Sequence, residues 1–415
     1  MSDRVQRYRR IGFAAFLLVS ALVLRWPSLQ RQIWNLDEGS TMTMAQLILA
    51  GQVPYREAAD NRTPLVPYVK AAILAVTGDW NTAAMHTGVA LMLGLTAVLL
   101  WQTARRLGQE KAGVIAALVF TFLSLGMIPA IDALTAHTGW FVVFFSSLGF
   151  WLFSRALGRS SFWLAGASGA AFGLSCLAKQ PGLLDFGVCL VILLLMATFN
   201  PGPRARLARL GACLLLGLVL PLAFTGLYFY RHGALNDLIF YAWTYNTKYY
   251  VPEVPLGERL AAVRVPFILL FTRLPVILLL GLAAAPVLLG RAFASLRQKA
   301  VGATVLPWLI LGWTAAGLLS TMLSGRDFGH YSIQVIPGLS LACGWLLAEL
   351  HQTALAWRNT GQAGRWRAAQ FAAGLALASI IVPTVMELRA LDTSDGQSEE
   401  VGRLVQGINP VTQLV

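Results

Sequence analysis

Residues 182–230 read GLLDFGVCLVILLLMATF, NPGPRARLAR and LGACLLLGLVLPLAFTGLYFY, which are two apolar stretches joined by a short basic segment. Each apolar stretch has about the length that an α-helix needs to cross the hydrocarbon core of a bilayer. The joining segment contains three arginines and no acidic residue, a composition typical of a cytoplasmic loop. This part of the chain therefore predicts two membrane-spanning helices and the side of the membrane on which they connect.

The same pattern recurs along the whole chain. Of the 415 residues, 57% are hydrophobic and 12% charged, whereas about 25% of the residues in a soluble domain are charged. We predict an all-α fold, a polytopic transmembrane bundle of about eleven helices over residues 1–390, followed by a short polar tail at 391–415. The predicted segments are 11–26, 84–103, 113–128, 138–153, 162–177, 182–199, 210–230, 265–289, 301–323, 332–349 and 368–386.

The charges sort by side in this topology. With the N-terminus in the cytoplasm, the inner segments hold 18 of the 32 lysines and arginines but only three of the 19 acidic residues. This is the positive-inside pattern, so the net charge of +13 indicates membrane topology and no nucleic-acid partner. We predict a multi-pass protein of the plasma (inner) membrane. Because the acidic residues collect outside, we expect an extracytoplasmic active site.

Two of the outer segments are long, at 27–83 and 231–264. In the first, Asp37 and Glu38 are expected to cap an amphipathic helix that continues through Leu49 and lies on the membrane surface. Two adjacent carboxylates beside a membrane also suit a general base, which takes a proton from an attacking hydroxyl or amine. Both interpretations are open from this pair of residues alone.

Arg62 follows about twenty residues later, just before a proline-rich turn that returns the chain to the membrane. A guanidinium at headgroup height binds phosphate oxygens bidentately. The alternative is an interfacial arginine that extends to the lipid headgroups.

Four groups of residues recur in one order on the predicted outer side. The first outer segment has LDEG at 36–39 and GQVPYREAADNRTPLVPYVKAAI at 51–73; IDALTAH at 131–137, LAKQPG at 177–182 and GRDFGHY at 325–331 follow. Together these motifs resemble the GT-C superfamily of membrane glycosyltransferases, in the branch of the protein O-mannosyltransferases and the lipid A aminoarabinose transferases.

The resemblance implies an inverting glycosyltransferase, which moves a sugar from a polyprenyl-phosphate carrier such as undecaprenyl phosphate to a lipid, glycan or protein acceptor at or outside the membrane. Its other expected partners are the membrane lipids. It implies that Asp37 is the catalytic carboxylate, with Glu38 beside it in support, and that Asp132 is the second acidic position. Arg62 stands where the family commonly has a lysine, and keeps the phosphate-binding charge. Further candidates to hold the phosphate or the sugar are Lys179, Arg326, His330 and Tyr331.

Each of these residues has a structural alternative. Asp132 is also placed to cap the next helix, Lys179 to extend from a helix end, and His330 and Tyr331 to lie in an aromatic belt. We expect no cofactor. A divalent metal held by Asp37, Asp132 and a histidine is chemically reasonable, but no ligand spacing indicates one.

A second function class also fits a bundle of this size. A multi-pass transporter or lipid flippase of the cell envelope uses ionisable groups near the middle of the membrane and often contains inverted repeats. The chain has no clear internal repeat, and most of its acidic residues lie in outer segments. The glycosyltransferase is therefore the preferred interpretation.

Overall fold

The computed structural model describes residues 3–30, 33, 35–78, 80–200, 202 and 204–390. Every regular element in these ranges is helical, with η denoting 3₁₀ and π segments. The predicted tail at 391–415 lies outside the described residues. The elements are α1 (Asp3–Leu24), η1 (Trp26–Gln30), α2 (Leu36–Leu49), α3 (Leu65–Thr77), α4 (Thr82–Arg106), α5 (Glu110–Gly126), α6 (Ala130–Ala133), α7 (Thr138–Arg159), α8 (Phe162–Ala178), α9 (Gly182–Phe199), α10 (Arg204–Arg231), α11 (Leu235–Ile239), η2 (Phe240–Tyr250), α12 (Leu256–Ala261), α13 (Arg264–Arg273), α14 (Pro275–Arg297), η3 (Val301–Ala303), α15 (Val305–Ser324), η4 (Gly329–Val335), α16 (Ile336–Asn359) and α17 (Ala363–Ala390).

Each predicted apolar segment coincides with helical structure, and the all-α fold is confirmed. Seven helices of the described part are long and apolar enough to cross a membrane by length and composition, so the number of eleven spans stays a prediction. The segment predicted at 265–289 is two helices, α13 and α14, because Leu274 leaves the helical region (φ −140°) before Pro275. Proline disfavours a helical conformation in the residue that precedes it.

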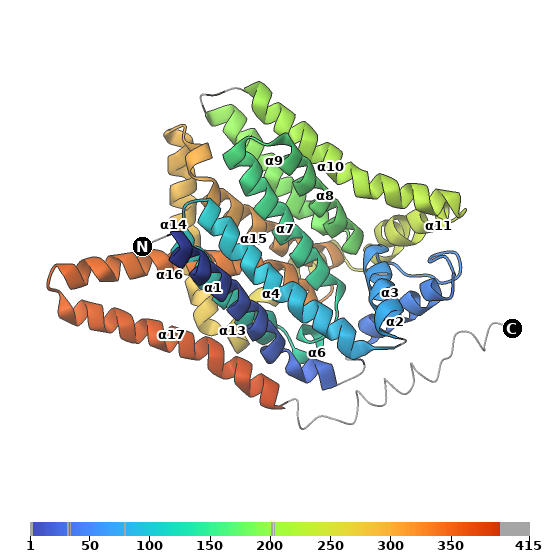
Figure 1. Ribbon diagram of the computed structural model, residues 1–415, viewed down its shortest axis with the longest axis horizontal. Helices are drawn as coiled ribbons and strands as arrows, with labels where there is room; N and C mark the ends of the chain where they lie inside the picture. The colour runs from blue at the N-terminus through green and yellow to red at the C-terminus, as the bar shows by residue number, and fades with distance from the viewer. Residues whose placement is uncertain are drawn as a thin grey trace.

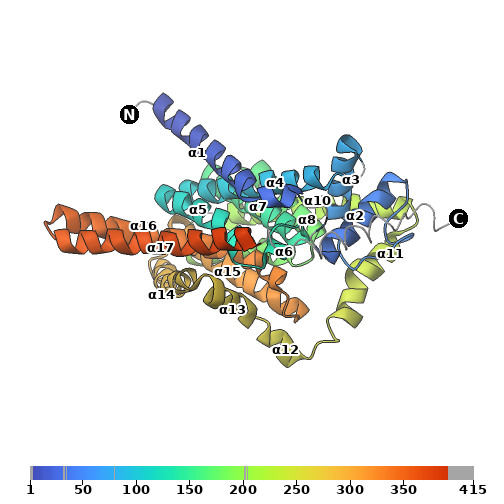
Figure 2. The ribbon, with the colours of Figure 1, turned by 90° about the horizontal axis from the view of Figure 1, so that it is seen from below.

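The long helices form one bundle with the short elements at one end. α4 packs against α1, α5 and α7, α8 packs between α7 and α10, and α16 packs against α5 and α15. In Figure 1, α2, α3 and α11 lie on the right and α6 at the lower centre, away from the α9–α10 turn at the top and the α16–α17 turn at the far left. Figure 2 shows α16 and α17 side by side, extending beyond the other helices.

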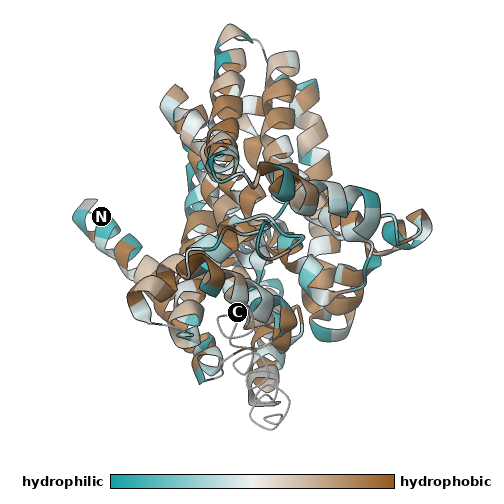
Figure 3. Cartoon of the chain, turned by 90° about the vertical axis from the view of Figure 1, so that its right-hand side faces the viewer, coloured by the Kyte–Doolittle hydropathy of each residue, from teal (hydrophilic) through white to brown (hydrophobic). Residues whose placement is uncertain are grey.

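Hydropathy follows this division. Figure 3 looks at the end that carries the short elements, and shows mainly apolar colouring along the long helices, with polar residues among the loops and short helices that face the viewer. Because lipid offers no hydrogen-bond partner to the backbone, chemistry-bearing polar groups are placed most easily at helix ends.

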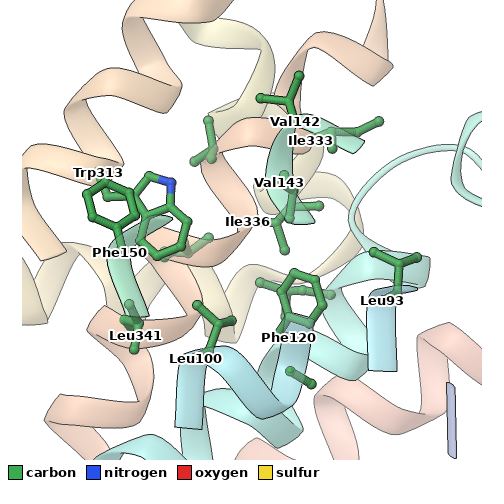
Figure 4. Close-up of a cluster of buried hydrophobic side chains, with 14 of the residues drawn as sticks. Leu93, Leu100, Phe120, Val142, Val143, Phe150, Trp313, Ile333, Ile336 and Leu341 are labelled. Atoms are coloured by element: carbon green, nitrogen blue, oxygen red, sulfur yellow. The ribbon is translucent and has the colours of Figure 1, made fainter. Parts of the chain in front are cut away.

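The core is built by large apolar side chains from helices far apart in the sequence. Phe150 of α7 faces Trp313 of α15 with ring centroids 4.3 Å apart, and both side chains are buried. Figure 4 shows Phe120 of α5 and Ile336 of α16 in the same cluster. The core thus fixes η4 and α16 relative to α5 and α7.

Two helices approach each other closely at glycines. A Cβ on Gly169 of α8 would lie 1.9 Å from the carbonyl oxygen of Leu214, and a Cβ on Gly217 of α10 would lie 1.9 Å from that of Gly166. Small residues allow membrane helices to come into backbone contact. The end of α8, which carries Lys179, is positioned by this contact.

Gly217→Ala should destabilise the protein by about 1–3 kcal/mol, because the added methyl group cannot fit unless α8 and α10 separate. Gly226→Ala in the same helix is the matched control, since no atom lies within 4 Å of a Cβ there. Thermal unfolding in detergent measures both. An unchanged midpoint for Gly217→Ala would contradict the close packing.

Candidate active site

A cavity of about 950 Å³ opens at the end of the bundle that carries the short helices. It is lined by residues of α2, α6, η2, α12 and η4, with the first residues of α7 and the residues that follow α8. Both long segments that the sequence placed outside contribute to it. The second is mostly helical, since α11, η2 and α12 fall within 231–264.

The α2 helix, which carries Asp37, begins one residue earlier than its predicted cap. The side chain of Asn35 accepts a hydrogen bond from the backbone N–H of Glu38 and is the N-cap. Asp37 and Glu38 lie inside the first turn, so the prediction that they cap the helix is wrong. Met42 is buried and Leu49 is exposed.

Asp37 is held from three sides. Its Oδ1 accepts a hydrogen bond from Nη2 of Arg62 at 2.5 Å, and its Oδ2 accepts one from Nε2 of His137 at 3.3 Å. Nε2 of His330 lies 4.0 Å from the same Oδ2. Burial alone would raise the pKa of Asp37, but the His137 hydrogen bond and the Arg62 charge outweigh it and hold that pKa well below its ordinary value. Asp37 is therefore ionised at neutral pH.

Arg62 lies between two carboxylates. Its Nη1 donates to both oxygens of Asp60, at 3.2 and 3.3 Å, while its Nη2 donates to Asp37. Burial would lower the pKa of Arg62, but the charges of Asp60 and Asp37 raise it above its ordinary value. The guanidinium thus serves first as the counter-ion of Asp37, although it also lines the cavity.

Lys179 and Tyr331 lie together on the cavity wall. The Nζ of Lys179 is 4.3 Å from the centre of the Tyr331 ring, and the Tyr331 hydroxyl is 3.3 Å from that of Tyr250 in η2. Burial and the charge of Arg62 lower the pKa of Lys179 to about 8, although Asp37 opposes the shift. The ammonium has no carboxylate within salt-bridge distance among the described residues.

His330 lies between the two predicted catalytic acids. Its Nδ1 is 3.6 Å from Oδ1 of Asp132, and its Nε2 faces Asp37. The side-chain amide of Asn35 donates to the same oxygen of Asp132 at 3.3 Å. Sequence positions 37, 132 and 330, predicted separately, therefore meet in one cluster.

Glu38 does not line the cavity. Its side chain is buried, its Oε1 lies 2.7 Å from Nε2 of His86, and the same oxygen accepts a hydrogen bond from the backbone N–H of Ala136 at 2.8 Å. The prediction that Glu38 assists Asp37 at the reacting atoms does not fit this placement. Neighbouring residues of a helix point about 100° apart, so only one of the pair faces the cavity.

Arg326 also stays outside the cavity lining. It donates to Oε2 of Glu253 at 2.7 Å and lies over the ring of Tyr250 at 4.3 Å. The resemblance implied that Arg326 holds the phosphate or the sugar, whereas its contacts in the structure are with Glu253 and Tyr250. It connects the segment after α15 to the segment after η2.

The segment around η2 packs on the first outer segment through a buried cluster that includes Tyr55 and Ala242, and through hydrogen bonds to one carbonyl group. The Asn61 oxygen accepts hydrogen bonds from the side chain of Asn246 at 2.6 Å and from that of Gln180 at 3.4 Å. Gln180 also donates to the carbonyl of Ala242. These contacts place η2 across the cavity.

Arg259 of α12 lines the cavity although sequence analysis did not select it. Its Nε is buried and has no hydrogen-bond partner among the described residues. It packs on Gly325, where a Cβ would lie 2.3 Å from the Arg259 Cγ and where φ is +67°. No spacing pattern distinguishes Arg259 from the other outer arginines, so only the fold identifies it.

Three more buried groups were missed. Arg25 is buried and donates to the carbonyl oxygens of Ala133 and Ser124. Lys70 donates to Thr41 at 2.7 Å. The third, His137, stands in the IDALTAH motif and is buried.

The donors of Asp37, His137 and His330 lie within 4.8 Å of one another, a spacing that suits a metal ion. The hydrogen bonds of His137, however, do not suit metal binding. Its Nδ1 accepts from the backbone N–H of Gly139 at 3.0 Å, so in the neutral ring the proton is on Nε2 and points to Asp37. A metal-bound histidine instead donates through its other nitrogen. These residues do not fit a metal held by all three.

Comparisons with known proteins agree with this architecture. The family model of dolichyl-phosphate-mannose-protein mannosyltransferases matches residues 61–229. The oligosaccharyltransferase of Archaeoglobus fulgidus, solved with a tethered acceptor peptide, superposes with a TM-score of 0.62 at 14% identity, over 94% of this chain and 56% of its own. This chain has the GT-C fold.

Two further structures extend the comparison. AglB from Archaeoglobus fulgidus, solved with an inhibitory peptide and a dolichol-phosphate, has a TM-score of 0.60 at 13% identity, over 93% of this chain and 56% of its own. ArnT from Cupriavidus metallidurans has a TM-score of 0.54 at 16% identity, over 83% of this chain and 63% of its own. The GT-C chain thus spans less than two thirds of each structure it resembles. A search of curated proteins finds no sequence match. The predicted GT-C-like fold is confirmed.

Glu38→Ala should destabilise the protein by about 3 kcal/mol, because it leaves His86 and the Ala136 N–H without their buried partner. Glu110→Ala is the control: Glu110 is exposed and pairs with Arg10 at 3.7 Å, so its loss should cost no more than about 1 kcal/mol. Thermal unfolding of the two variants checks this. Equal midpoints would argue against a structural role for Glu38.

Proposed function

We propose that this protein is an inverting glycosyltransferase, which takes a sugar from a polyprenyl-phosphate carrier and transfers it to a lipid, glycan or protein acceptor on the extracytoplasmic side of the plasma membrane. The observation that carries the proposal is one cavity, in a GT-C fold, that joins the anionic Asp37 to the cationic Lys179 and Arg259. An acceptor nucleophile and a lipid phosphate have opposite electrostatic needs. One cavity offers both environments.

The comparisons support a transferase over a transporter or flippase. The family model belongs to mannosyltransferases that use a dolichyl-phosphate donor, and a structure with the same fold holds a dolichol-phosphate. The cluster of Asp37, Asp132 and His330 lies at one end of the bundle, where Figure 1 shows α2 and α6. A transport pathway instead places ionisable groups near the middle of the membrane.

Lys179 and Arg259 are suited to the donor phosphate. The sugar–phosphate bond breaks with its electron pair on the phosphate oxygen, so a second negative charge develops on the leaving group. Preorganised cations stabilise such a charge in the transition state. Lys179 and the unpartnered Nε of Arg259 are free to do so, whereas Arg62 is already engaged by Asp37 and Asp60.

Asp37 is suited to the acceptor. Its carboxylate is ionised and 35% exposed, and it is fixed in place by Arg62 and His137. A hydroxyl or amine that donates to it is oriented for attack on the anomeric carbon from the side opposite the phosphate, which inverts that centre. No acceptor class is favoured by the cavity.

The topology that we propose has the N-terminus in the cytoplasm and the cavity outside. The basic residues that sort to the inner segments support it, as does the gathering of α2, α3, α6 and α11 at the other end of the bundle (Figure 1).

The test is release of radiolabelled sugar from undecaprenyl-phosphate donors by protein in membranes. Asp37→Asn should reduce transfer at least ~100-fold, because it removes the charge that orients the nucleophile. Asp327→Asn should transfer like the wild type, since Asp327 is exposed, pairs with Arg264 and does not line the cavity. Transfer by Asp37→Asn at the wild-type rate would refute the role of Asp37.

The donor KM should rise as the pH increases through about 8. The pKa of Lys179 is lowered to about 8, so the ammonium is charged below that pH and neutral above it, and only the charged form attracts the phosphate. In Lys179→Arg the rise should vanish, because a guanidinium stays charged. KM and kcat measured from pH 6.5 to 9.5 in both proteins check this; a flat wild-type KM would exclude Lys179 from donor binding.

A further inference from the structure

We propose that His330, oriented by Asp132, accepts the proton of the acceptor nucleophile, and that Asp37 binds the nucleophile without taking its proton. The inference rests on the proposed glycosyl transfer. Sequence analysis placed His330 with the phosphate or the sugar; its position between the two acids points to a different part of the reaction.

The geometry is that of a carboxylate–imidazole pair that opens onto a cavity. Nδ1 of His330 lies 3.6 Å from Oδ1 of Asp132, and Nε2 faces the space beside Asp37, whose Oδ2 is 4.0 Å away. The His330 side chain is 13% exposed and lines the cavity. With its proton on Nδ1 toward Asp132, the ring presents an unprotonated Nε2 where a nucleophile bound to Asp37 would lie. Catalytic hydrogen bonds are often long before the substrate binds.

Asp132 is held so that it can orient the ring. Asn35 donates to its Oδ1, and Thr135 donates to its backbone carbonyl at 2.8 Å. The turn that carries it is fixed by the bond from Arg25 to the Ala133 carbonyl. Asp132 therefore acts on the reaction through His330 and is a positioning residue.

The contacts that let Asp37 bind the nucleophile also make it a poor proton acceptor. Arg62 and His137 hydrogen-bond to its two oxygens, and both contacts favour the ionised form. A carboxylate stabilised in this way binds the acceptor O–H or N–H but releases little free energy on protonation. The base must lie elsewhere.

His137 is excluded as that base by its own contacts. Its Nδ1 accepts from Gly139, and its Nε2–H donates to Asp37. Both nitrogens are thus committed, and the side chain is only 2% exposed. His330 is the one remaining imidazole among the described cavity residues.

The step balances without a co-reactant. The nucleophile oxygen or nitrogen forms a bond to the anomeric carbon as the bond from that carbon to the phosphate oxygen breaks, and the polyprenyl phosphate leaves with the electron pair. The proton of the nucleophile passes to Nε2 of His330. The imidazolium lies between the carboxylates of Asp132 and Asp37, and its proton then passes to water or to the departing phosphate.

Charged groups of both signs surround His330. The charged groups that line the same cavity are Asp37 of α2, Asp132 of α6, Arg62 before α3, Lys179 after α8 and Arg259 of α12. The ring centre of His137 lies 4.4 Å from that of His330, and the two rings are tilted by 38°. Histidines titrate between about pH 5 and 8, whereas Asp37 stays ionised throughout that range. An imidazole base therefore gives a kcat that falls on acidification across this range, and Asp37 as the base gives a flat profile.

The experiment is kcat for label transfer from a radiolabelled undecaprenyl-phosphate sugar, at saturating donor, from pH 5 to 8. The wild type should lose at least ~10-fold between pH 8 and 5. His330→Gln should lose at least ~100-fold at pH 7.5 with no acid limb and a little-changed donor KM. Asp132→Asn keeps the ring but removes a negative charge beside it, so its acid limb should move to lower pH and its kcat should fall.

The control is His351→Gln, which changes an exposed histidine of α16 about 22 Å along that helix from its start, and should match the wild type. Unfolding midpoints establish that each variant is folded. A His330→Gln enzyme with the wild-type limb and at least a third of the rate would overturn the inference and leave the proposed function intact, as would an unmoved limb in folded Asp132→Asn. No transfer by the wild type from any donor would overturn both.

Discussion

The buried contact of Glu38 with His86 and the Ala136 N–H is the interaction on which the cavity depends. Nδ1 of His86 lies 2.6 Å from the Ser28 carbonyl, which can only accept, so this nitrogen carries a proton. The Nε2 of His86 lies 2.7 Å from Oε1 of Glu38. The side chains of Glu38 and His86 together thus connect α2, α4, η1 and the turn before α7. Asp37 is the residue before Glu38, and Asp132 and His137 lie close to Ala136 in the chain. The contact therefore holds these cavity residues relative to one another.

The fold was largely predictable because few backbone conformations are stable within a bilayer. Backbone groups in lipid must be satisfied within the segment, so each apolar run had to be a helix, and the runs coincide with helices. The break between α13 and α14 was harder, because a proline in a membrane helix is compatible with a kink as well as a stop. The structure within 231–264 was missed, since aromatic, polar residues in short helices give no sustained apolar period.

The site was predictable in its residues more than in its roles. Asp37, Asp132, Lys179, His330 and Tyr331 meet in one cavity. Glu38 was misplaced because a sequence shows that two acids are adjacent, but only the packing of α2 shows which one faces inward. Arg62 was predicted beside a phosphate; its pairing with Asp60, two residues earlier, depends on the backbone turn between them. Arg259 carried no motif at all.

The hydrogen bonds to the Asn61 carbonyl couple the position of η2 to that of Arg62. Asn246 of η2 holds this carbonyl, and the next residue along the chain, Arg62, holds Asp37. The η2 segment and the Asp37 carboxylate are thus connected through two consecutive residues, Asn61 and Arg62. A shift of η2 would therefore act on the residue next to Arg62, and through Arg62 on the ion pair with Asp37.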